Sequence, residues 1–520
     1  MFRRILIANR GEIALRIIRT CREMGVEPVA VFSEVDRRSL HVRMAHSAIP
    51  LGGSTPRESY LDAQKVIDAA KASGAEAIHP GYGFLSERAH FARAVVEAGL
   101  EWIGPPAEAI DAMGDKITSR RNMTRAGVPV VPGLVDPVDD ADKALVEAEA
   151  IGYPIALKAA AGGGGKGIRI VRSPAEMPGA FRTASAEAVA SFGDGRMYME
   201  RYLDEPRHIE VQLLFDKHGQ GVHFGERECS IQRRHQKLIE EAPSVVVDDA
   251  LRARMGEIAV RAGAAVGYQN AGTVEFLYSK GEVYFLEMNT RLQVEHPVTE
   301  MVYGVDLVRE QLRVASGEKL GYTQADVLAR KQGWSMEVRI NAEDPFNGFV
   351  PSTGVIGNLR APGGPWVRLD AALYRGMEVS LNYDPMLAKL IVWGPDRVTA
   401  IERMKRALAE LNVGGVRTSA PAALTVLEDE RFVRGEFDTH FLNSVDLAAP
   451  RGGEDELVAA AAAIHRHLLA RRRALSTGDS TRAAWAARSR ARHSAYPPHI
   501  SDPHSSATPS LGQAQKGASR

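Results

Sequence analysis

The chain has 520 residues, and its 65 basic and 65 acidic side chains give a formal net charge of +0 at pH 7. This balance gives no reason to expect nucleic acid or a membrane surface as a partner, so neither is predicted. Cys21 and Cys229 form neither a disulfide framework nor a metal-ligand spacing, which is typical of a cytoplasmic protein.

A β-α-β pattern opens the chain. An apolar strand at residues 5–8, an amphipathic helix at 13–24 and a strand at 28–32 predict a parallel sheet. The turn at 9–12 lacks the glycines of a dinucleotide site. Because polar residues follow the apolar start at once, we expect no signal peptide, and no apolar stretch approaches membrane length.

The same unit continues with a predicted strand at 75–78 and a loop at 79–86. This loop is rich in glycine, proline and aromatic residues. It either lines a binding crevice or shapes a tight turn, and both interpretations remain open. A strand at 102–103 ends the unit, and the proline and glycine residues at 128–133 indicate a domain edge. At this length we expect three or four domains.

Four consecutive glycines, residues 162–165, lie between predicted strands at 155–157 and 168–171. Glycine is costly in ordered structure, so such a run usually lets backbone N–H groups approach a ligand. Phosphate is the expected ligand, with charge supplied by Lys158 and Lys166. A strand rather than a helix follows, which excludes a Walker loop. The alternative is a surface hairpin with solvated lysines.

Two further polar stretches follow. Residues 200–203, after a strand at 197–199, offer an edge for an adenine ring. Residues 225–237 contain many strong donors, which suit phosphates, ribose and a small anion, whereas the alternative is a solvated loop. His208 or His235, taken alone, indicates a structural histidine.

Two β-rich runs, 273–278 and 283–288, predict a hairpin. If the pairing is centred on Gly281, Glu275 and Glu287 lie opposite each other on one face. Facing carboxylates suit hard divalent cations, although an exposed hairpin with solvated glutamates has the same pattern.

Residues 287–297 form the densest polar segment. They contain two carboxylates, two carboxamides, a guanidinium and a histidine directly after an apolar run. Asn289 lies on the same side of its strand as Glu287. Unpaired buried carboxylates are costly, so these groups must be paired, hydrated or bound to a cation. We interpret this segment as the catalytic centre.

From Trp334 the pattern is rich in strands, and a helix is expected at 398–411. The pair Met404-Lys405 lies inside that helix. Beyond residue 446 we expect an alanine-rich helix at 457–473 and then a disordered tail. The helix either docks a partner or is a solvated extension.

The chain resembles the biotin carboxylases, the ATP-grasp component of biotin-dependent carboxylases, over residues 2–445. Long motifs in family order carry the resemblance, and they lie at residues 7–14, 79–87, 113–116, 232–237, 287–300 and 339–345. The glycine loop departs from some bacterial members because Ala160-Ala161 stands where they have Ser-Gly. This variant resembles the acyl-CoA carboxylase branch.

The resemblance implies a multidomain α/β and α+β fold. A Rossmann-like domain is expected at 1–114 and an ATP-grasp domain at 115–331, with a glycine-loop lid at 132–203. A strand-rich C-terminal domain is expected at 332–446, and the helix and tail at 447–520.

It also implies site residues. The positions that match the ATP site are Lys116, Lys158, Gly163, Gly164, Gly165, Lys166, Gly167, Glu200, Leu203, His208, Gln232, His235, Glu275 and Glu287. The ligands of two Mg²⁺ or Mn²⁺ ions match Glu275, Glu287 and Asn289. Bicarbonate positions match Lys237, Arg291, Gln293 and Val294, the general base matches Glu295, and a biotin position matches Arg339.

The implied reaction is ATP- and bicarbonate-dependent carboxylation of biotin N1 through carboxyphosphate, as the first half-reaction of an acetyl-CoA or acyl-CoA carboxylase. The implied partners are a biotin carboxyl carrier protein and a carboxyltransferase subunit, with the chain itself a homodimer. Resembling proteins place the biotinylated lysine on a tight hairpin, whereas Met404-Lys405 lies inside a predicted helix, so the carrier is expected to be another polypeptide. One alternative is the biotin carboxylase component of a split pyruvate carboxylase. Another is a non-catalytic nucleotide-binding assembly protein. The sequence leaves the final carboxyl acceptor open.

Overall fold

The computed structural model describes residues 1–134, 136–159, 169–192, 194–447 and 454–476. The predicted phosphate-loop residues Gly163, Gly164, Gly165, Lys166 and Gly167 lie outside this part, as does the predicted tail. Residues Met1–Leu447 form one compact unit, and the described residues beyond it, 454–476, belong to a second unit, which is described by itself.

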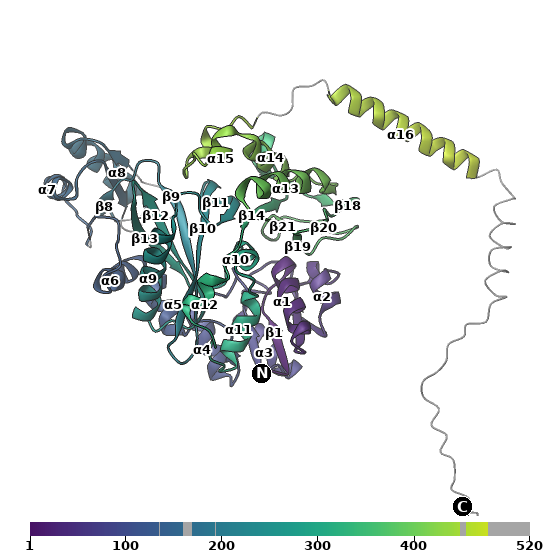
Figure 1. Ribbon diagram of the computed structural model, residues 1–520, viewed down its shortest axis with the longest axis horizontal. Helices are drawn as coiled ribbons and strands as arrows, with labels where there is room; N and C mark the ends of the chain where they lie inside the picture. Colours follow the sequence, from purple (N-terminus) through teal and green to yellow (C-terminus); the bar gives the residue numbers. More distant parts are fainter. Residues whose placement is uncertain (135, 160–168, 193, 448–453, 477–520) are drawn as a thin grey trace, which may run out of the picture. The chain divides into compact units, whose positions relative to one another are not determined.

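The first layer is a five-stranded parallel sheet near the N-terminus (Figure 1). Its strands, in spatial order, are β3 (Ser47–Pro50), β2 (Glu27–Phe32), β1 (Arg4–Ile7), β4 (Ala77–His79) and β5 (Glu101–Trp102). The helices of this region are α1 (Gly11–Glu23), α2 (Leu40–Met44), α3 (Ala63–Ser73), α4 (Ala89–Glu97) and α5 (Ala107–Gly114). The strand order reverses at β1, as in doubly wound folds, which confirms the Rossmann-like prediction. Helix α1 begins two residues before the predicted start.

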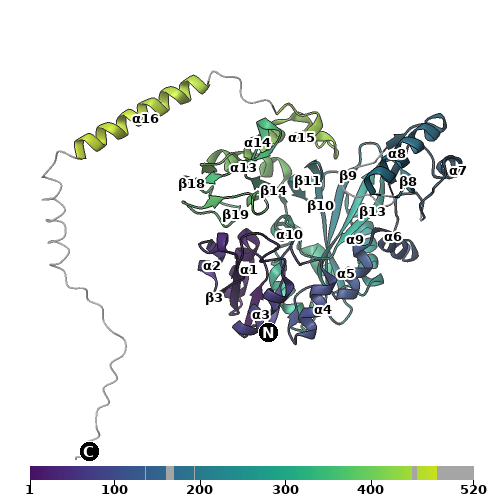
Figure 2. The same ribbon diagram turned by 180° about the vertical axis from the view of Figure 1, so that it is seen from behind.

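A small lobe projects from the unit, with α7, α8 and β8 at its edge in Figures 1 and 2. It is built on a three-stranded antiparallel sheet in the order β7-β6-β8. Its elements are β6 (Ile155–Ala159), β7 (Arg169–Val171), β8 (Met197–Arg201), α7 (Ala141–Ile151) and α8 (Met177–Phe192). The apolar faces of these elements form a core of their own, separate from the other cores. The preceding helix α6 spans Lys116–Arg125.

The central element is an eight-stranded antiparallel sheet. Its strands, in spatial order, are β13 (Glu282–Asn289), β12 (Asn270–Ser279), β9 (Arg207–Phe215), β10 (Gly221–Arg233), β11 (Gln236–Ala242), β14 (Trp334–Asn341), β21 (Met386–Gly394) and β19 (Val367–Ala371). Residue 332, where we expect a domain boundary, lies between β11 and β14 along the chain. These two strands pair, so one sheet contains strands from both sides of the expected boundary. The helices that follow β11 and β13 are α9 (Asp249–Ala265), α10 (His296–Tyr303), α11 (Leu307–Ala315) and α12 (Gln324–Ala329).

The predicted hairpin is β12–β13, and Glu275 pairs with Glu287 as expected. The route to this pairing differs from the prediction. The turn is centred between Lys280 and Gly281, because Ser279 pairs with Glu282, and simple alternation would then place Leu286 opposite Glu275. A β-bulge at Leu286 shifts the register by one residue and brings the two glutamates opposite each other.

The remaining elements complete the C-terminal part. They are the short strands β15 (Glu343–Asp344), β16 (Val350–Pro351), β17 (Gly354–Val355), β18 (Asn358–Arg360), β20 (Glu378–Val379) and β22 (Asn412–Gly414), and the helices α13 (Arg397–Glu410), α14 (Ala420–Glu428) and α15 (Glu430–Arg434). Met404 is fully buried in α13. In the second unit, α16 spans Glu454–Ser476, which confirms the predicted helix. No helix of the described residues is long and apolar enough to cross a membrane.

Candidate functional site

One large cavity, about 1290 Å³ in volume, lies where the first domain, the small lobe and the central sheet meet. It collects the predicted site residues that the structure describes with their side chains. These are Lys158, Glu200, Leu203, His208, Gln232, His235, Lys237, Glu275, Glu287, Asn289, Arg291, Gln293, Val294, Glu295 and Arg339. Lys116 begins α6, but its side chain lies outside the described part. The loop at 79–86 contributes Tyr82, Gly83 and Phe84 to the wall, which favours the binding-crevice interpretation.

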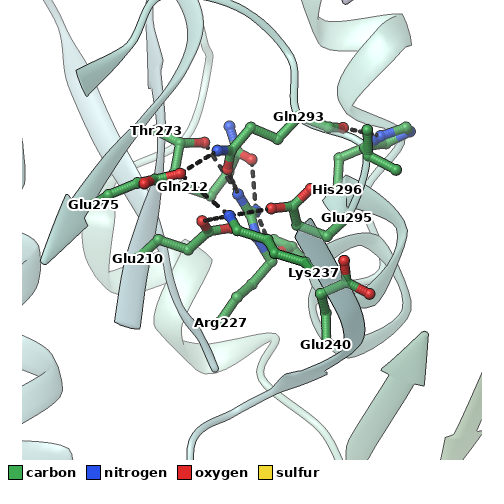
Figure 3. A network of polar contacts seen from close by, with 12 residues as sticks. Glu210, Gln212, Arg227, Lys237, Glu240, Thr273, Glu275, Gln293, Glu295 and His296 are labelled. Atoms are coloured by element: carbon green, nitrogen blue, oxygen red, sulfur yellow. Dashed lines mark hydrogen bonds and ion pairs between the residues drawn. The ribbon is translucent and has the colours of Figure 1, made fainter. Parts of the chain in front are cut away.

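The ammonium of Lys237 lies at the centre of a cluster of glutamates (Figure 3). Its Nζ donates to Glu295 Oε1 at 2.5 Å, to Glu210 Oε2 at 2.7 Å and to Glu275 Oε1 at 3.2 Å. Burial disfavours the charged ammonium, but the surrounding anionic groups outweigh it and raise the pKa of Lys237 well above its ordinary value. Lys237 therefore stays protonated and offers a fixed positive charge.

Arg227, on β10, is fully buried beneath this cluster, and all five of its N–H groups have acceptors. Nε donates to Glu210 Oε1 at 2.5 Å, and Nη2 donates to Gln293 Oε1 at 2.7 Å and Thr273 Oγ1 at 3.0 Å. Nη1 donates to side-chain oxygens of Gln212 and Thr299. The sequence patterns do not single out this residue, which positions both the glutamate cluster and Gln293.

Glu295 is buried at the start of α10 and pairs with two cationic side chains. Besides Lys237, the guanidinium of Arg339 donates from Nη2 to Glu295 Oε2 at 2.9 Å. Burial raises the cost of the carboxylate charge, but Lys237 and Arg339 outweigh it and hold the pKa of Glu295 well below its ordinary range. The Nε of Arg339 donates to Glu240 Oε1 at 2.5 Å. Burial raises the pKa of Glu240 to about 7, even though Arg339 opposes this.

Glu275, Glu287 and Asn289 line the cavity from the β12–β13 hairpin. Glu275 is buried, and its Oε2 lies 3.0 Å from His208 Nε2. Burial opposes its ionisation, but Lys237 and His208 hold its pKa well below its ordinary value. Glu287 is exposed at the cavity wall. Two carboxylates and an amide oxygen on one ribbon are a donor set that fits a hard divalent cation.

Other residues predicted to bind nucleotide line the same cavity. Lys158 of β6 forms an ion pair with Glu200 of β8, so both project from the small lobe into the cavity. Gln232 Nε2 lies 3.4 Å from His208 Nδ1. The predicted alternative of a solvated loop at 225–237 is wrong, because β10 and β11 pair as a tight hairpin whose strands are largely buried.

The turn of that hairpin is Arg234-His235, with φ of 49° and 66°. Both residues have a positive φ, which places their backbone in the left-handed region. Residues other than glycine and asparagine rarely adopt this conformation. Such strained backbone is typical of functional sites. The turn places His235 at the cavity wall.

Arg291 is held by the first domain. Its Nε donates to Glu87 Oε2 at 2.9 Å, and the backbone N–H of Thr290 donates to Glu87 Oε1 at 3.1 Å. Its Nη2 donates to Asn289 Oδ1 at 2.9 Å. Glu87 lies within a motif of the resemblance but is not among the predicted site residues.

Three family models match the chain in order. They are described as "Biotin carboxylase, N-terminal domain" at residues 1–110, "Carbamoyl-phosphate synthase L chain, ATP binding domain" at 115–323, and "Biotin carboxylase C-terminal domain" at 337–444. Among curated proteins, Biotin carboxylase 1 of Bacillus subtilis is 50% identical over 449 residues, covering 86% of this chain and 99% of the relative. The chain belongs to the biotin carboxylase family. Enzymes of this family are ATP-dependent ligases, and this chain has their fold and is an enzyme of that class.

Other similar proteins are named as parts of different carboxylases. A pyruvate carboxylase component of Methanothermobacter thermautotrophicus is 52% identical over 443 residues, covering 85% of this chain and 90% of the relative. The solved biotin carboxylase domain dimer of Hydrogenobacter thermophilus 2-oxoglutarate carboxylase, in complex with MgADP, ADP and bicarbonate, has 48% identity and a TM-score of 0.78, and the match covers 85% of this chain and 97% of that one. The Campylobacter jejuni biotin carboxylase–β,γ-ATP complex has 45% identity and a TM-score of 0.79, with coverage of 85% and 99%.

Proposed function

We propose that this biotin carboxylase carboxylates N1 of biotin on a separate carrier protein, using ATP and bicarbonate, as the first half-reaction of an acetyl-CoA or acyl-CoA carboxylase. The observation that carries the proposal is the position of Lys237. It lies between the base candidate Glu295 and the cation-site candidate Glu275, in a cavity that the nucleotide candidates also line.

Bicarbonate is a poor nucleophile unless it is held still beside the γ-phosphoryl group. We assign that task to Lys237 and Arg291, whose charges face the same cavity. Glu295 accepts the bicarbonate proton. Its low pKa depends on its ion pairs with Lys237 and Arg339, so an anion that competes for these cations raises the basicity of Glu295 toward the value a general base needs.

Glu275, Glu287 and Asn289 would hold Mg²⁺ or Mn²⁺, and bound ions would neutralise the charge that develops on the transferred phosphoryl group. The protein side chains do the rest of the binding. Lys158 binds the nucleotide from the small lobe, and His208 and His235 bind it from the hairpin side. The side chain of Lys116 and the glycine run, which lie outside the described residues, belong to the same proposal.

A bicarbonate oxygen attacks the γ-phosphorus, ADP leaves, and carboxyphosphate forms. Carboxyphosphate then breaks into CO₂ and phosphate, the phosphate takes the N1 proton of biotin, and N1 bonds to CO₂. Arg291 stabilises the enolate oxygen of the ureido ring during this step, and Arg339 orients biotin.

The carboxyl acceptor belongs to the same proposal. The Ala160-Ala161 variant in the glycine loop supports an acyl-CoA carboxylase, whereas the likeness to a pyruvate carboxylase component supports the split pyruvate carboxylase as a second candidate. In either case the chain acts as a homodimer in the cytoplasm, and its partners are a biotin carboxyl carrier protein and a carboxyltransferase subunit.

The test is ATP hydrolysis by the purified full chain, with bicarbonate and free biotin each added or omitted. Turnover that requires both supports the ligase. A protein that binds ATP but shows no bicarbonate-dependent turnover would instead be a nucleotide-binding assembly protein. Reconstitution with a biotinylated carrier and a carboxyltransferase, supplied with acetyl-CoA, propionyl-CoA or pyruvate, then identifies the acceptor.

A further inference from the structure

Lys389 is a fully buried lysine of β21 that lies behind the cavity rather than in its wall. Its Nζ donates to the backbone oxygen of Val294 at 2.8 Å. Val294 is the residue between Gln293 and Glu295, and all three line the cavity. A charged donor on a peptide oxygen in a dry environment is a strong, directed contact.

The acidic neighbours of Lys389 lie farther away than this carbonyl. Glu12 Oε2 lies 3.6 Å and Asp370 Oδ2 lies 4.0 Å from Nζ. The Tyr82 ring centroid is 5.8 Å away. Neither carboxylate oxygen of Glu12 has a hydrogen-bond partner among the described residues. The ammonium is thus placed on the Val294 oxygen, although a carboxylate is within reach.

The peptide oxygen just before it is also held. His296 donates from Nδ1 to the backbone oxygen of Gln293 at 2.7 Å. Two consecutive peptide oxygens, those of Gln293 and Val294, are therefore fixed by buried side chains. These contacts set the planes of the peptides that follow Gln293 and Val294, and so the directions in which Gln293 and Glu295 project.

Lys389 also joins three distant parts of the chain. Glu12 belongs to α1 of the first domain, Val294 follows the hairpin of the central sheet, and Lys389 comes from the C-terminal part. The same three parts line the cavity, so one buried ammonium links the Gln293–Glu295 segment to both the first domain and the C-terminal part.

We propose that Lys389 is a positioning residue for the bicarbonate site: by holding the Val294 carbonyl, it fixes the segment from which Gln293 and Glu295 reach the anion. This inference rests on the proposed function. Lys389 does not touch substrate, so it acts through the backbone rather than as a catalytic residue.

The experiment compares steady-state kinetics of four full-length variants with wild type, varying bicarbonate and ATP in turn. Lys389→Met removes the donor, and Lys389→Met with Glu12→Gln also removes the carboxylate that would lose its cation. Lys389→Arg keeps a charged donor. Lys217→Met is the matched control, because Lys217 Nζ also donates to a backbone oxygen, that of Ala315, at 2.8 Å, but outside the cavity.

We expect both Lys389→Met proteins to raise the KM for bicarbonate about tenfold, with the KM for ATP changed less than twofold, and Lys389→Arg to recover part of the loss. KM does not depend on the folded fraction of enzyme, so partial unfolding does not mimic this result. A bicarbonate KM within twofold of wild type overturns the inference, and so does failure of both Lys389→Met proteins to fold, which would assign Lys389 to stability alone. If wild type itself shows no bicarbonate-dependent turnover, the proposed function fails first.

Discussion

Replacing Arg227 with methionine removes a buried cation whose five N–H groups are all used. Breaking a buried ion pair from one side typically costs about 3–5 kcal/mol, because the remaining charge has no compensation. Here Lys237 stays 2.7 Å from Glu210 and retains part of the compensation. We therefore expect a loss at the lower end, about 3 kcal/mol of unfolding free energy.

Urea denaturation at pH 7, followed by far-UV circular dichroism, measures this loss. Arg227→Met with Glu210→Gln should recover part of it, because the unpaired carboxylate is gone. Arg252→Met is the control: Arg252 is also buried and paired, with Nε 2.7 Å from Glu226 Oε2. Its partners do not line the cavity, whereas Gln293, a partner of Arg227, does. Both single variants should be destabilised, and only Arg227→Met should raise the KM for bicarbonate. A loss under about 1 kcal/mol, or equal kinetic effects in the two variants, would refute the reasoning.

Three further outcomes are expected. Glu295→Gln should abolish bicarbonate-dependent turnover and leave ATP binding, measured by calorimetry, nearly intact; loss of both would mark a structural residue. Arg339→Ala should weaken biotin-dependent turnover more than bicarbonate-dependent phosphate release, and equal losses would contradict its assignment to biotin. Burial raises the pKa of Glu12 from 4.5 to about 7, so its contribution to stability is complete below about pH 4.5 and is lost as the pH rises to about 7. The stability of Glu12→Gln relative to wild type should therefore increase by about 2–3 kcal/mol between pH 5 and pH 8 in urea titrations, and a flat difference would show that Glu12 does not titrate this way.

Patterns within short stretches of the sequence predicted those site residues that lie close together along the chain. The alternation of side chains, together with a turn assumed to be centred on Gly281, predicted Glu275 opposite Glu287, and the structure has this pair. The bulge at Leu286, on which that pairing depends, leaves no mark in the sequence, since bulges accept many residue types. The predicted pairing of the two glutamates was therefore right, although the register nearer the turn was off by one residue.

Arg227 shows what sequence patterns leave out. Its acceptors lie at Glu210, Gln212, Thr273, Gln293 and Thr299, on segments that only the folded sheet brings together. A single arginine in a polar stretch does not indicate such partners. The hairpin turn at Arg234-His235 escaped prediction for a different reason, because it lacks the asparagine and glycine that usually mark two-residue turns.

The pairing of β11 with β14 joins residues about a hundred positions apart in one hydrogen-bonded ladder. Lys237 and Arg339 lie on these neighbouring strands, so neither can slide past the other without rupturing main-chain bonds. Chimaeras that exchange the last third of the chain between relatives at residue 332 would cut through this ladder and mismatch its two halves. Recombination intended to retarget the enzyme should keep both strands from one parent and move its crossover points to the segments that connect the small lobe.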